Sequence, residues 1–292
     1  MMIKKTVTAG LSFFILLGAL YFGYDRYKLY INNPWTRDAQ VRTQVIQVAP
    51  RVSGMVTEIA IKDNQFVHKG DTLFVIDSSK YKLKVLQAKA RLQRAKEASR
   101  GAKIEYDRVQ KIYKRDKGAV SQKDLTRNQI NYYKSLADIE SSKESLHVAE
   151  LNLAWTKVQA SVDGWVSNVN FELGTQAVAN KPILALVDKN SFWVFGFFKE
   201  SSIASIGVGD KAVVTLMAYP DTPIKGKVES IAWGISHSDA NPGKNLLPKV
   251  QPVFAWIRLA QRIPVKIKLQ EPLPKGITLR YGMSASVVVS KD

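Results

Sequence analysis

The stretch VAPRVSGMVTEIAIKDNQFVHKGDTLFVID, residues 48–77, is echoed by QASVDGWVSNVNFELGTQAVANKPILALVD, residues 159–188. Each copy reads as strand, turn and strand, and each ends in an aspartate. A half-sheet of this size cannot bury its apolar face alone, so the two copies are predicted to pair into one small β-sandwich. The helical segment between them must then leave the sandwich at one edge and return there.

The alignment of the two copies contains a conformational clue. With Gly54 placed on Gly164, Asn64 falls on Gly174, and Asn and Gly are the residues that most readily adopt a left-handed backbone at a tight turn. One extra residue before Val178 restores the match through to the closing aspartates. The pattern therefore predicts equivalent turns in the two copies.

Two paired half-motifs of this kind resemble the biotinyl/lipoyl fold. The form that is split by a long helical hairpin looks like the periplasmic membrane fusion (adaptor) proteins of the HlyD type. Two further stretches, PWTRDAQVRTQVIQVAPRVSG (Pro34–Gly54) and WIRLAQRIPVKIKL (Trp256–Leu269), are similar to the adaptor subunits of aromatic carboxylic acid efflux pumps, such as the p-hydroxybenzoic acid efflux subunit. The resemblance covers nearly the whole chain.

The resemblance implies a multi-domain, mainly β fold class with a long α-helical hairpin. Its expected parts, in chain order, are a cytoplasmic tip and transmembrane anchor (1–28), a membrane-proximal strand segment (29–47), the first lipoyl half-motif (48–77), a coiled-coil hairpin (78–156), the second half-motif (157–188), a β-barrel (189–270) and C-terminal membrane-proximal strands (271–292). The two chain ends are expected to build a membrane-proximal β-domain beyond the barrel.

The same resemblance implies the partners of the chain. These are an inner-membrane exporter, an outer-membrane TolC-like channel, the membrane itself and further copies of the chain in a ring of six. The exporter would supply the transport energy, because Gly207-x-Gly209 before Asp210 indicates a turn and lacks the rest of a phosphate loop. The implied location is the inner membrane of a Gram-negative cell, with the bulk of the chain in the periplasm.

The N-terminus carries an apolar run. Thr6–Tyr24 contains no charged residue and is about long enough to cross the hydrocarbon core as a helix. No small-x-small cleavage site follows it, which favours an uncleaved anchor over a signal peptide. Basic residues flank the run on both sides, so its orientation is taken from the resemblance, with the N-terminus in the cytoplasm.

The formal charge of +18 raises the question of nucleic-acid binding. The sequence has no zinc-finger spacing and no RNA-binding aromatic motif, so nucleic acid is not an expected partner. Residues 78–155 hold 18 Lys/Arg against 9 Asp/Glu, so half of the excess lies on the predicted hairpin. A charged, solvated helix face is the simpler interpretation, and a basic inner lining that attracts anionic cargo is the alternative.

The segment between the copies has alternating steps of four and three residues, the seam of a coiled coil. The predicted seam comprises Tyr81, Val85, Ala88, Leu92, Ala95, Ser99, Ala102, Tyr106, Val109 and Tyr113 in the first arm and Leu125, Gln129, Tyr132, Leu136, Ile139, Lys143, Leu146, Glu150 and Leu153 in the second. The turn is expected at residues 117–120, where Gly118 ends the first helix and Ser121 with Asp124 caps the second.

A long rod on a small sandwich suits a spacer that reaches a distant partner. In the resembling family the hairpin tip docks onto the outer-membrane channel through an arginine, an apolar residue and a serine near the turn. The nearest residues here are Arg108, Ile112 and Ser121, with Val120 beside the serine and Gly118 in the turn. The interval from Ile112 to Ser121 exceeds the family pattern, and Ser121 also has a sufficient structural role as an N-cap.

Short segments broken by Gly and Pro predict a small antiparallel barrel after Asp188. The expected elements are strands at Ile224–Trp233, Val253–Leu259, Pro264–Leu269 and Ser284–Ser290, a helical turn at Glu200–Ile206 and a surface loop at Ser236–Gln251. Residues 36–47 are expected to pair with the last strands. Arg258 and Arg262 are candidate carboxylate contacts, although arginines that border a strand more often face solvent or pair structurally.

Neither catalysis nor a covalent cofactor is expected. The three histidines, His68, His147 and His237, are scattered and have neither metal-site nor triad spacing, and the chain has no cysteine. A lipoyl-type carrier bears its cofactor on a lysine between the half-motifs, but here that tip is opened by the helices, and Lys189 follows the second copy instead. Catalytic, metal and cofactor sites are therefore all predicted to be absent, and an intact mass equal to that of the bare chain would exclude the carrier.

Overall fold

The computed structural model describes residues 17–18, 20–23, 33–234, 260–274 and 276–290. These fall into two compact units, one formed by residues 45–188 and the other by the chain on either side of them. The predicted anchor Thr6–Tyr24 lies mostly outside the described residues. Among the residues that are described, none belongs to a helix of sufficient length and apolarity for a membrane crossing.

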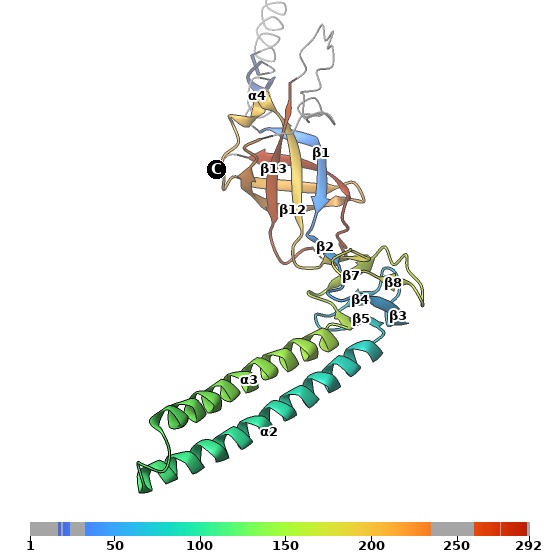
Figure 1. The fold of residues 1–292 in the computed structure, drawn as a ribbon. Coiled ribbons are helices and arrows are strands. Elements are labelled where there is room, and N and C mark those ends of the chain that lie inside the picture. The colour runs from blue at the N-terminus through green and yellow to red at the C-terminus, as the bar shows by residue number, and fades with distance from the viewer. Residues whose placement is uncertain (1–16, 19, 24–32, 235–259, 275, 291–292) are drawn as a thin grey trace, which may run out of the picture. The chain divides into compact units, whose positions relative to one another are not determined.

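The first unit contains the predicted β-sandwich (Figure 1). One sheet has the order β2-β9-β7-β4 and the other β6-β5-β3-β8. The strands are β2 (Val45–Val48), β3 (Gly54–Ile59), β4 (Phe66–Val67), β5 (Thr72–Ile76), β6 (Lys157–Gln159), β7 (Gly164–Ser167), β8 (Gln176–Ala177) and β9 (Leu184–Asp188). Residues of both copies share one core, in which Val56 and Val166 are fully buried.

The two copies exchange equivalent contacts. The amide of Asn64 donates to the carbonyl of Val166 at 3.0 Å, and the amide of Gly174 donates to the carbonyl of Val56 at 2.9 Å. Asn64 has a φ of 59° and Gly174 a φ of 88°, so the predicted left-handed turns are confirmed. The echo in the sequence is therefore a two-fold repeat in the fold.

The position of the extra residue was predicted wrongly. Gly70 and Asn180 are also equivalent, since both have positive φ and each donates its amide to the other half of the chain, Gly70 to Ala160 and Asn180 to Pro50, both at 2.9 Å. The register of the repeat thus holds through Asn180, and the insertion follows it. Val178 is 48% exposed and is not the counterpart of a core residue.

Gly164 is the tightest position of the repeat. A Cβ at this position would lie 2.1 Å from the carbonyl oxygen of Val187, which is backbone and cannot swing away. We expect Gly164→Ala to lower the free energy of unfolding by about 1–3 kcal/mol, because the sheet must shift to admit the methyl group. Urea unfolding of the full chain followed by circular dichroism measures this.

The matched control is Gly101→Ala in the hairpin, where no atom lies within 4 Å of the added Cβ. A glycine-to-alanine change in an unobstructed helix should raise the stability by about 0.5–1 kcal/mol. Equal effects of the two substitutions would contradict the proposed clash.

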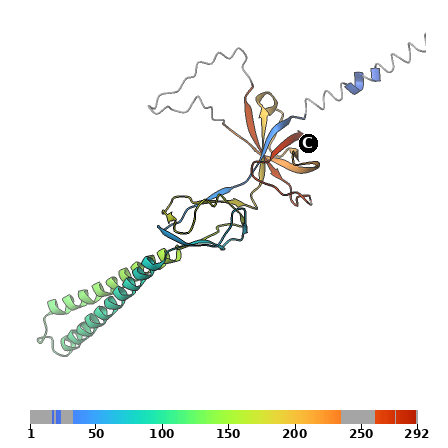
Figure 2. The same ribbon diagram turned by 90° about the vertical axis from the view of Figure 1, so that its right-hand side faces the viewer.

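The hairpin consists of α2 (Ser79–Arg115) and α3 (Gln122–Ala154), which lie side by side in both views (Figures 1 and 2). At 1.5 Å per residue, α2 is about 55 Å long. The seam predicted for α2 is confirmed, because none of its residues is exposed and Tyr81, Val85, Ser99 and Val109 are buried.

The seam predicted for α3 was wrong at alternate positions. Leu136, Lys143 and Glu150 are exposed, whereas Ser142 and Ala149 are buried. Ser135 faces α2 and donates a hydrogen bond to the hydroxyl of Ser99 at 3.0 Å. Small side chains line this seam because they let the helices approach closely, while the prediction favoured the bulkier neighbour at each step.

The hairpin is anchored where α2 leaves the sandwich. The hydroxyl of Tyr81 donates to the carbonyl of Ser53 at 2.7 Å, and the ring belongs to the sandwich core. The carboxylate of Asp77 accepts the amide of Ser79 at 2.9 Å. This hydrogen bond favours the charged form and lowers the pKa of Asp77 below its ordinary value.

The second unit is a closed barrel with the strand order β1-β10-β13-β12-β11-β14. Its elements are β1 (Trp35–Arg42), β10 (Trp193–Lys199), α4 (Glu200–Ile203), β11 (Lys211–Leu216), β12 (Tyr219–Ile231), β13 (Arg262–Leu269) and β14 (Ser284–Ser290). The core inside it is aliphatic apart from Phe198. The predicted strand Val253–Leu259 and loop Ser236–Gln251 lie outside the described residues.

The barrel corrects one feature of the expected fold class. The strands of the two chain ends were assigned to a separate membrane-proximal β-domain, but β1 and β14 pair with each other and close the barrel itself. A barrel built from residues 189–270 alone would expose two hydrogen-bonding edges, and the chain ends cover them. The segment 29–47 is also divided, because β2 pairs with β9 in the sandwich.

Candidate functional site: the hairpin tip

The turn between α2 and α3 is organised by Asp116, the C-cap of α2. Its amide bonds the carbonyl of Ile112 at 2.8 Å, and its carboxylate accepts the amide of Gly118 at 2.9 Å. Such local side-chain bonds stabilise a turn without a left-handed residue. Gly118 is not among the glycines with positive φ, so the expectation that it ends α2 is corrected.

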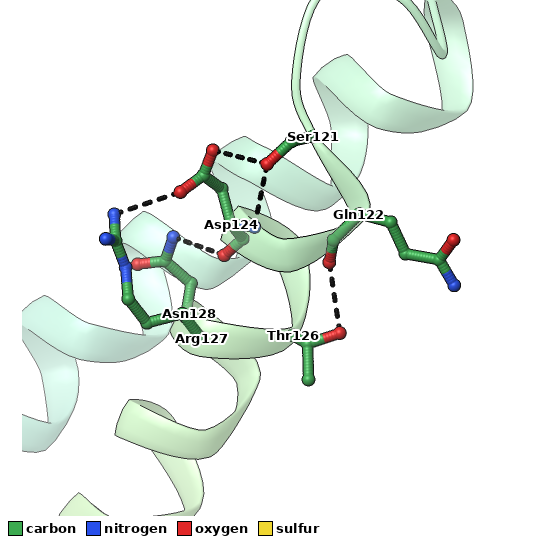
Figure 3. Close-up of polar contacts among 6 residues, drawn as sticks. All are labelled: Ser121, Gln122, Asp124, Thr126, Arg127 and Asn128. Atoms are coloured by element: carbon green, nitrogen blue, oxygen red, sulfur yellow. Dashed lines mark hydrogen bonds and ion pairs between the residues drawn. The ribbon is translucent and has the colours of Figure 1, made fainter.

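The side chain of Ser121 caps the start of α3 (Figure 3). The hydroxyl of Ser121 accepts the amide of Asp124 at 3.1 Å and donates to its carboxylate at 2.6 Å. Arg127 holds the same carboxylate at 3.2 Å. The predicted cap is confirmed, and the negative charge of Asp124 lies in the first turn, where the helix dipole favours it.

Removal of this cap should loosen the tip. We expect Ser121→Ala to destabilise the first turn of α3 by about 1 kcal/mol, because the backbone amide of Asp124 loses the hydroxyl that accepts its hydrogen bond. Faster hydrogen exchange at residues 122–126 measures the effect. Ser145→Ala, which removes an exposed hydroxyl bonded within the same helix, is the control and should leave that exchange unchanged.

The residues predicted to dock are only partly brought together. Gly118, Val120 and Ser121 share the turn, whereas Arg108 lies two helical turns back in α2 and pairs with Glu105 at 3.0 Å. Ile112 is 39% exposed and Val120 is half-buried. In the described part of the chain, no contact joins Arg108 to the turn.

A surface hollow beside the turn was not predicted. It has a volume of about 470 Å³ and is lined by Gln122, Lys123, Thr126, Arg127, Ile130 and Asn131. Ile130 is 60% exposed there. The signal was present in the spacing of these residues, since steps of four place Gln122, Thr126 and Ile130 on one helix face.

The hairpin has an uneven charge. Helix α2 carries 13 Lys/Arg and 3 Asp/Glu, whereas α3 carries 4 and 5. Four exposed lysines of α2, which we call the lysine column, recur at intervals of seven residues: Lys82, Lys89, Lys96 and Lys103. Seven residues advance about 10 Å along a helix, so the column forms a straight basic stripe beside the seam.

The remaining candidate residues that the structure describes are exposed or paired with other side chains of the chain. Arg262 pairs with Asp38 of β1, which is the structural alternative to a carboxylate ligand, and Arg258 lies outside the described residues. His68 is exposed beside Asp163, His147 is exposed on α3 and His237 is not described. Across the described ranges, no cluster of three His, Cys, Asp or Glu suits a metal ion.

Two family models match successive parts of the chain. Residues 44–189, the sandwich with its hairpin, match the RND MFP barrel-sandwich hybrid domain. Residues 191–290, which include the barrel strands from β10 to β14, match the AAEA-like beta-barrel domain. The chain belongs to the membrane fusion protein family. This confirms the coarser resemblance drawn from the repeat and the hairpin.

One sequence relative and two solved structures are similar to this membrane fusion protein. The Uncharacterized protein YdhJ of Escherichia coli (strain K12) is 33% identical over 98% of this chain and 99% of its own. The solved membrane fusion protein Spr0693 from Streptococcus pneumoniae R6 has a TM-score of 0.59 and 17% identity over 87% of this chain and 99% of its own. MacA from Actinobacillus actinomycetemcomitans has a TM-score of 0.58 and 22% identity, covering 89% and 80%. The two solved structures support the fold.

The family defines the general role. Membrane fusion proteins are adaptors of efflux pumps and are structural components rather than enzymes. They are periplasmic and membrane-associated, form oligomers and pair with inner-membrane transporters and outer-membrane channels. The hairpin tip is therefore a candidate protein-docking site and not a candidate active site.

Proposed function

We propose that this membrane fusion protein joins an inner-membrane exporter to an outer-membrane TolC-like channel and serves the export of aromatic carboxylic acids. A single N-terminal span (1–28) would hold it in the inner membrane, with the bulk of the chain in the periplasm. The observation that carries the proposal is the length of the hairpin, because two helices of 37 and 33 residues extend far beyond what a small sandwich core needs.

The surface of the hairpin supports assembly with further copies. Large apolar side chains more than one third exposed lie outside the seam: Leu83, Leu86 and Ile104 on α2 and Ile130, Tyr133, Leu136, Val148 and Leu151 on α3. A solitary hairpin gains nothing from them, whereas packing against neighbouring hairpins buries them. We propose a ring of six copies.

The charges indicate how the copies would meet. Ser99 and Ser135 are in contact across the seam, which fixes the axial register of the two helices. On this register, the exposed carboxylates Glu140 and Glu144, which share the side of α3 away from the seam, lie at the height of residues 90–94, within the span of the lysine column. Neighbouring hairpins that point the same way would therefore place the lysine column of one copy beside these two carboxylates of the next.

The proposed cargo is supported by sequence similarity and by charge. The segments Pro34–Gly54 and Trp256–Leu269 resemble adaptors of aromatic carboxylic acid pumps, and the second falls within the residues that match the AAEA-like family model. A chain with a net charge of +18 also attracts anions more than neutral solutes. Both observations favour acids over neutral drugs as cargo.

A tolerance assay tests the cargo. Deletion of the gene together with its exporter, in cells that lack redundant pumps, should lower the tolerated concentration of 4-hydroxybenzoate but not that of 4-hydroxybenzyl alcohol. The wild-type gene pair should restore tolerance, which controls for secondary effects of the deletion. Unchanged tolerance to a panel of such acids would contradict the cargo and favour a multidrug or other small-molecule adaptor.

A further inference from the structure

We propose that a groove on the sandwich, between the edge strands β2 and β6, binds single-ring aromatic carboxylates. The groove has a volume of about 400 Å³, which falls within the range of small-molecule sites. Both strands are the outermost of their sheets, so their free edges form its sides. The choice of ligand rests on the proposed cargo, whereas the site itself rests on the charges, the apolar surface and the backbone contacts of the groove.

The charged side chains that line the groove are all basic. Arg51 and Lys157 line it, and its full lining, which lies wholly within the described residues, contains no acidic side chain. Neither cation has an ion pair within the described parts of the chain. An arginine and a lysine that share a groove without a carboxylate are suited to hold an anion through charge-assisted hydrogen bonds.

The groove also offers an apolar surface to a ring. Val48 and Val158 belong to the sandwich core at its floor, and Ile46 is half-buried beside them. The indole of Trp155 forms part of the wall, with the guanidinium of Arg51 5.2 Å from its centroid. A ligand with a flat apolar ring and one carboxylate therefore matches the two kinds of surface, while inorganic phosphate would leave the apolar part unused.

The binding side chains project from fixed backbone. The carbonyl of Pro50 accepts the amide of Asn180 at 2.9 Å, which holds the residue before Arg51. The amide of Trp155 donates to Leu151 at 2.9 Å at the end of α3, and the carbonyl of Thr156 accepts the amide of Ile76 at 2.8 Å. Little ordering of the backbone is thus required when a ligand binds.

An added β-strand fits this groove less well. β6 has three residues and β2 has four, and Pro50 follows β2 closely, so neither edge offers a long row of backbone partners. The charged Lys157 on β6 is also a typical device against strand addition. These features favour a small ligand over an extended peptide or a second copy.

A titration of the full-length chain in detergent micelles tests the site. With ¹⁵N-tryptophan labelling, the indole signal of Trp155, assigned from Trp155→Phe, should shift saturably on addition of 4-hydroxybenzoate, with a dissociation constant of about 1 mM for a ligand of this size. Neutral 4-hydroxybenzyl alcohol should bind at least tenfold more weakly, because it cannot pair with the cations.

Two variants complete the test. Arg51→Gln with Lys157→Gln should weaken binding of the acid at least tenfold, and Lys62→Gln, an exposed site elsewhere on the sandwich, should not. The proposal is overturned if the acid gives no saturable shift up to about 10 mM or binds the double variant as well as the wild type. If the acid binds the groove but the gene deletion does not change tolerance, the proposed cargo is contradicted and the proposed binding site stands.

Discussion

Reversal of the lysine column should abolish self-assembly of the chain. In the variant Lys82→Glu, Lys89→Glu, Lys96→Glu, Lys103→Glu, the column becomes acidic and would lie beside Glu140 and Glu144 of a neighbouring α3, which carry the same charge. Exposed pairs are worth about 0.2–1 kcal/mol each, so loss of attraction and gain of repulsion at up to four positions should cost roughly 2–8 kcal/mol per interface. Sedimentation of the full-length chain in detergent should show rings for the wild type and monomers for the variant.

A charge swap within the same chain separates a defined interface from a general charge effect. Glu140→Lys with Glu144→Lys, added to Lys89→Glu with Lys96→Glu, should restore assembly, because each copy presents both faces in a head-to-tail ring. Lys62→Glu with Lys181→Glu alters two exposed lysines of the sandwich and should not affect it. If the reversed column still assembles, or if the swap fails to rescue it, the hairpins do not meet through these faces.

Salt provides an independent check on the same interface. The column is solvent-exposed, and the Debye length falls from about 10 Å at 0.1 M salt to about 3 Å at 1 M. High salt should therefore weaken wild-type assembly in part, since the exposed apolar residues of the hairpin remain attractive. It should also reduce the penalty of the reversed column. An interface that depended on apolar contacts alone would not weaken in this way.

The sandwich could be predicted because its two halves have matching turn residues in the sequence. Asn64 and Gly174 occupy matched left-handed positions, and few residue types tolerate that backbone. The later pair, Gly70 and Asn180, escaped notice because the residue types are reversed between the copies and the register was shifted one turn too early. A comparison that treats Asn and Gly as equivalent would have placed the insertion correctly.

The seam of α3 and the inclusion of β1 in the barrel were harder to predict for a common reason. Both depend on where a distant segment lies and not on local pattern. Ser135 bonds Ser99 of α2 and Ser142 is buried, and no hydrophobic period marks such a contact between small polar side chains. The closure of the barrel by β1 and β14 likewise depends on free sheet edges that only the folded chain presents.

The sequence indicated where the hairpin tip lies but not which surfaces surround it. The length of the hairpin and the Ser121–Asp124 capping pair located the tip, since caps follow local rules. The hollow around Ile130 and the groove between β2 and β6 were missed. The groove brings together residues about one hundred positions apart, and nothing in either segment alone indicates it.

Introduction of an acidic residue at the tip should abolish binding of the outer-membrane channel. Val120→Asp places a charge on a half-buried apolar side chain of the turn, where docking would have to desolvate it. Central interface residues typically contribute about 2 kcal/mol or more, so the affinity for the channel should fall by at least about thirtyfold. Co-purification from membranes should then recover the exporter and lose the channel.

Val120→Asp also perturbs the turn itself, so a second variant is needed to assign the loss to docking. Ile130→Asp changes a side chain that is 60% exposed in the hollow on α3 and should leave the helix intact, yet it should lose the channel in the same way. Val178→Asp, at a 48% exposed valine of the sandwich, is the control and should retain both partners. Retention of the channel by both tip variants would show that docking occurs elsewhere on the chain, because a packed interface cannot tolerate a new charge in the turn and another on the adjoining part of α3.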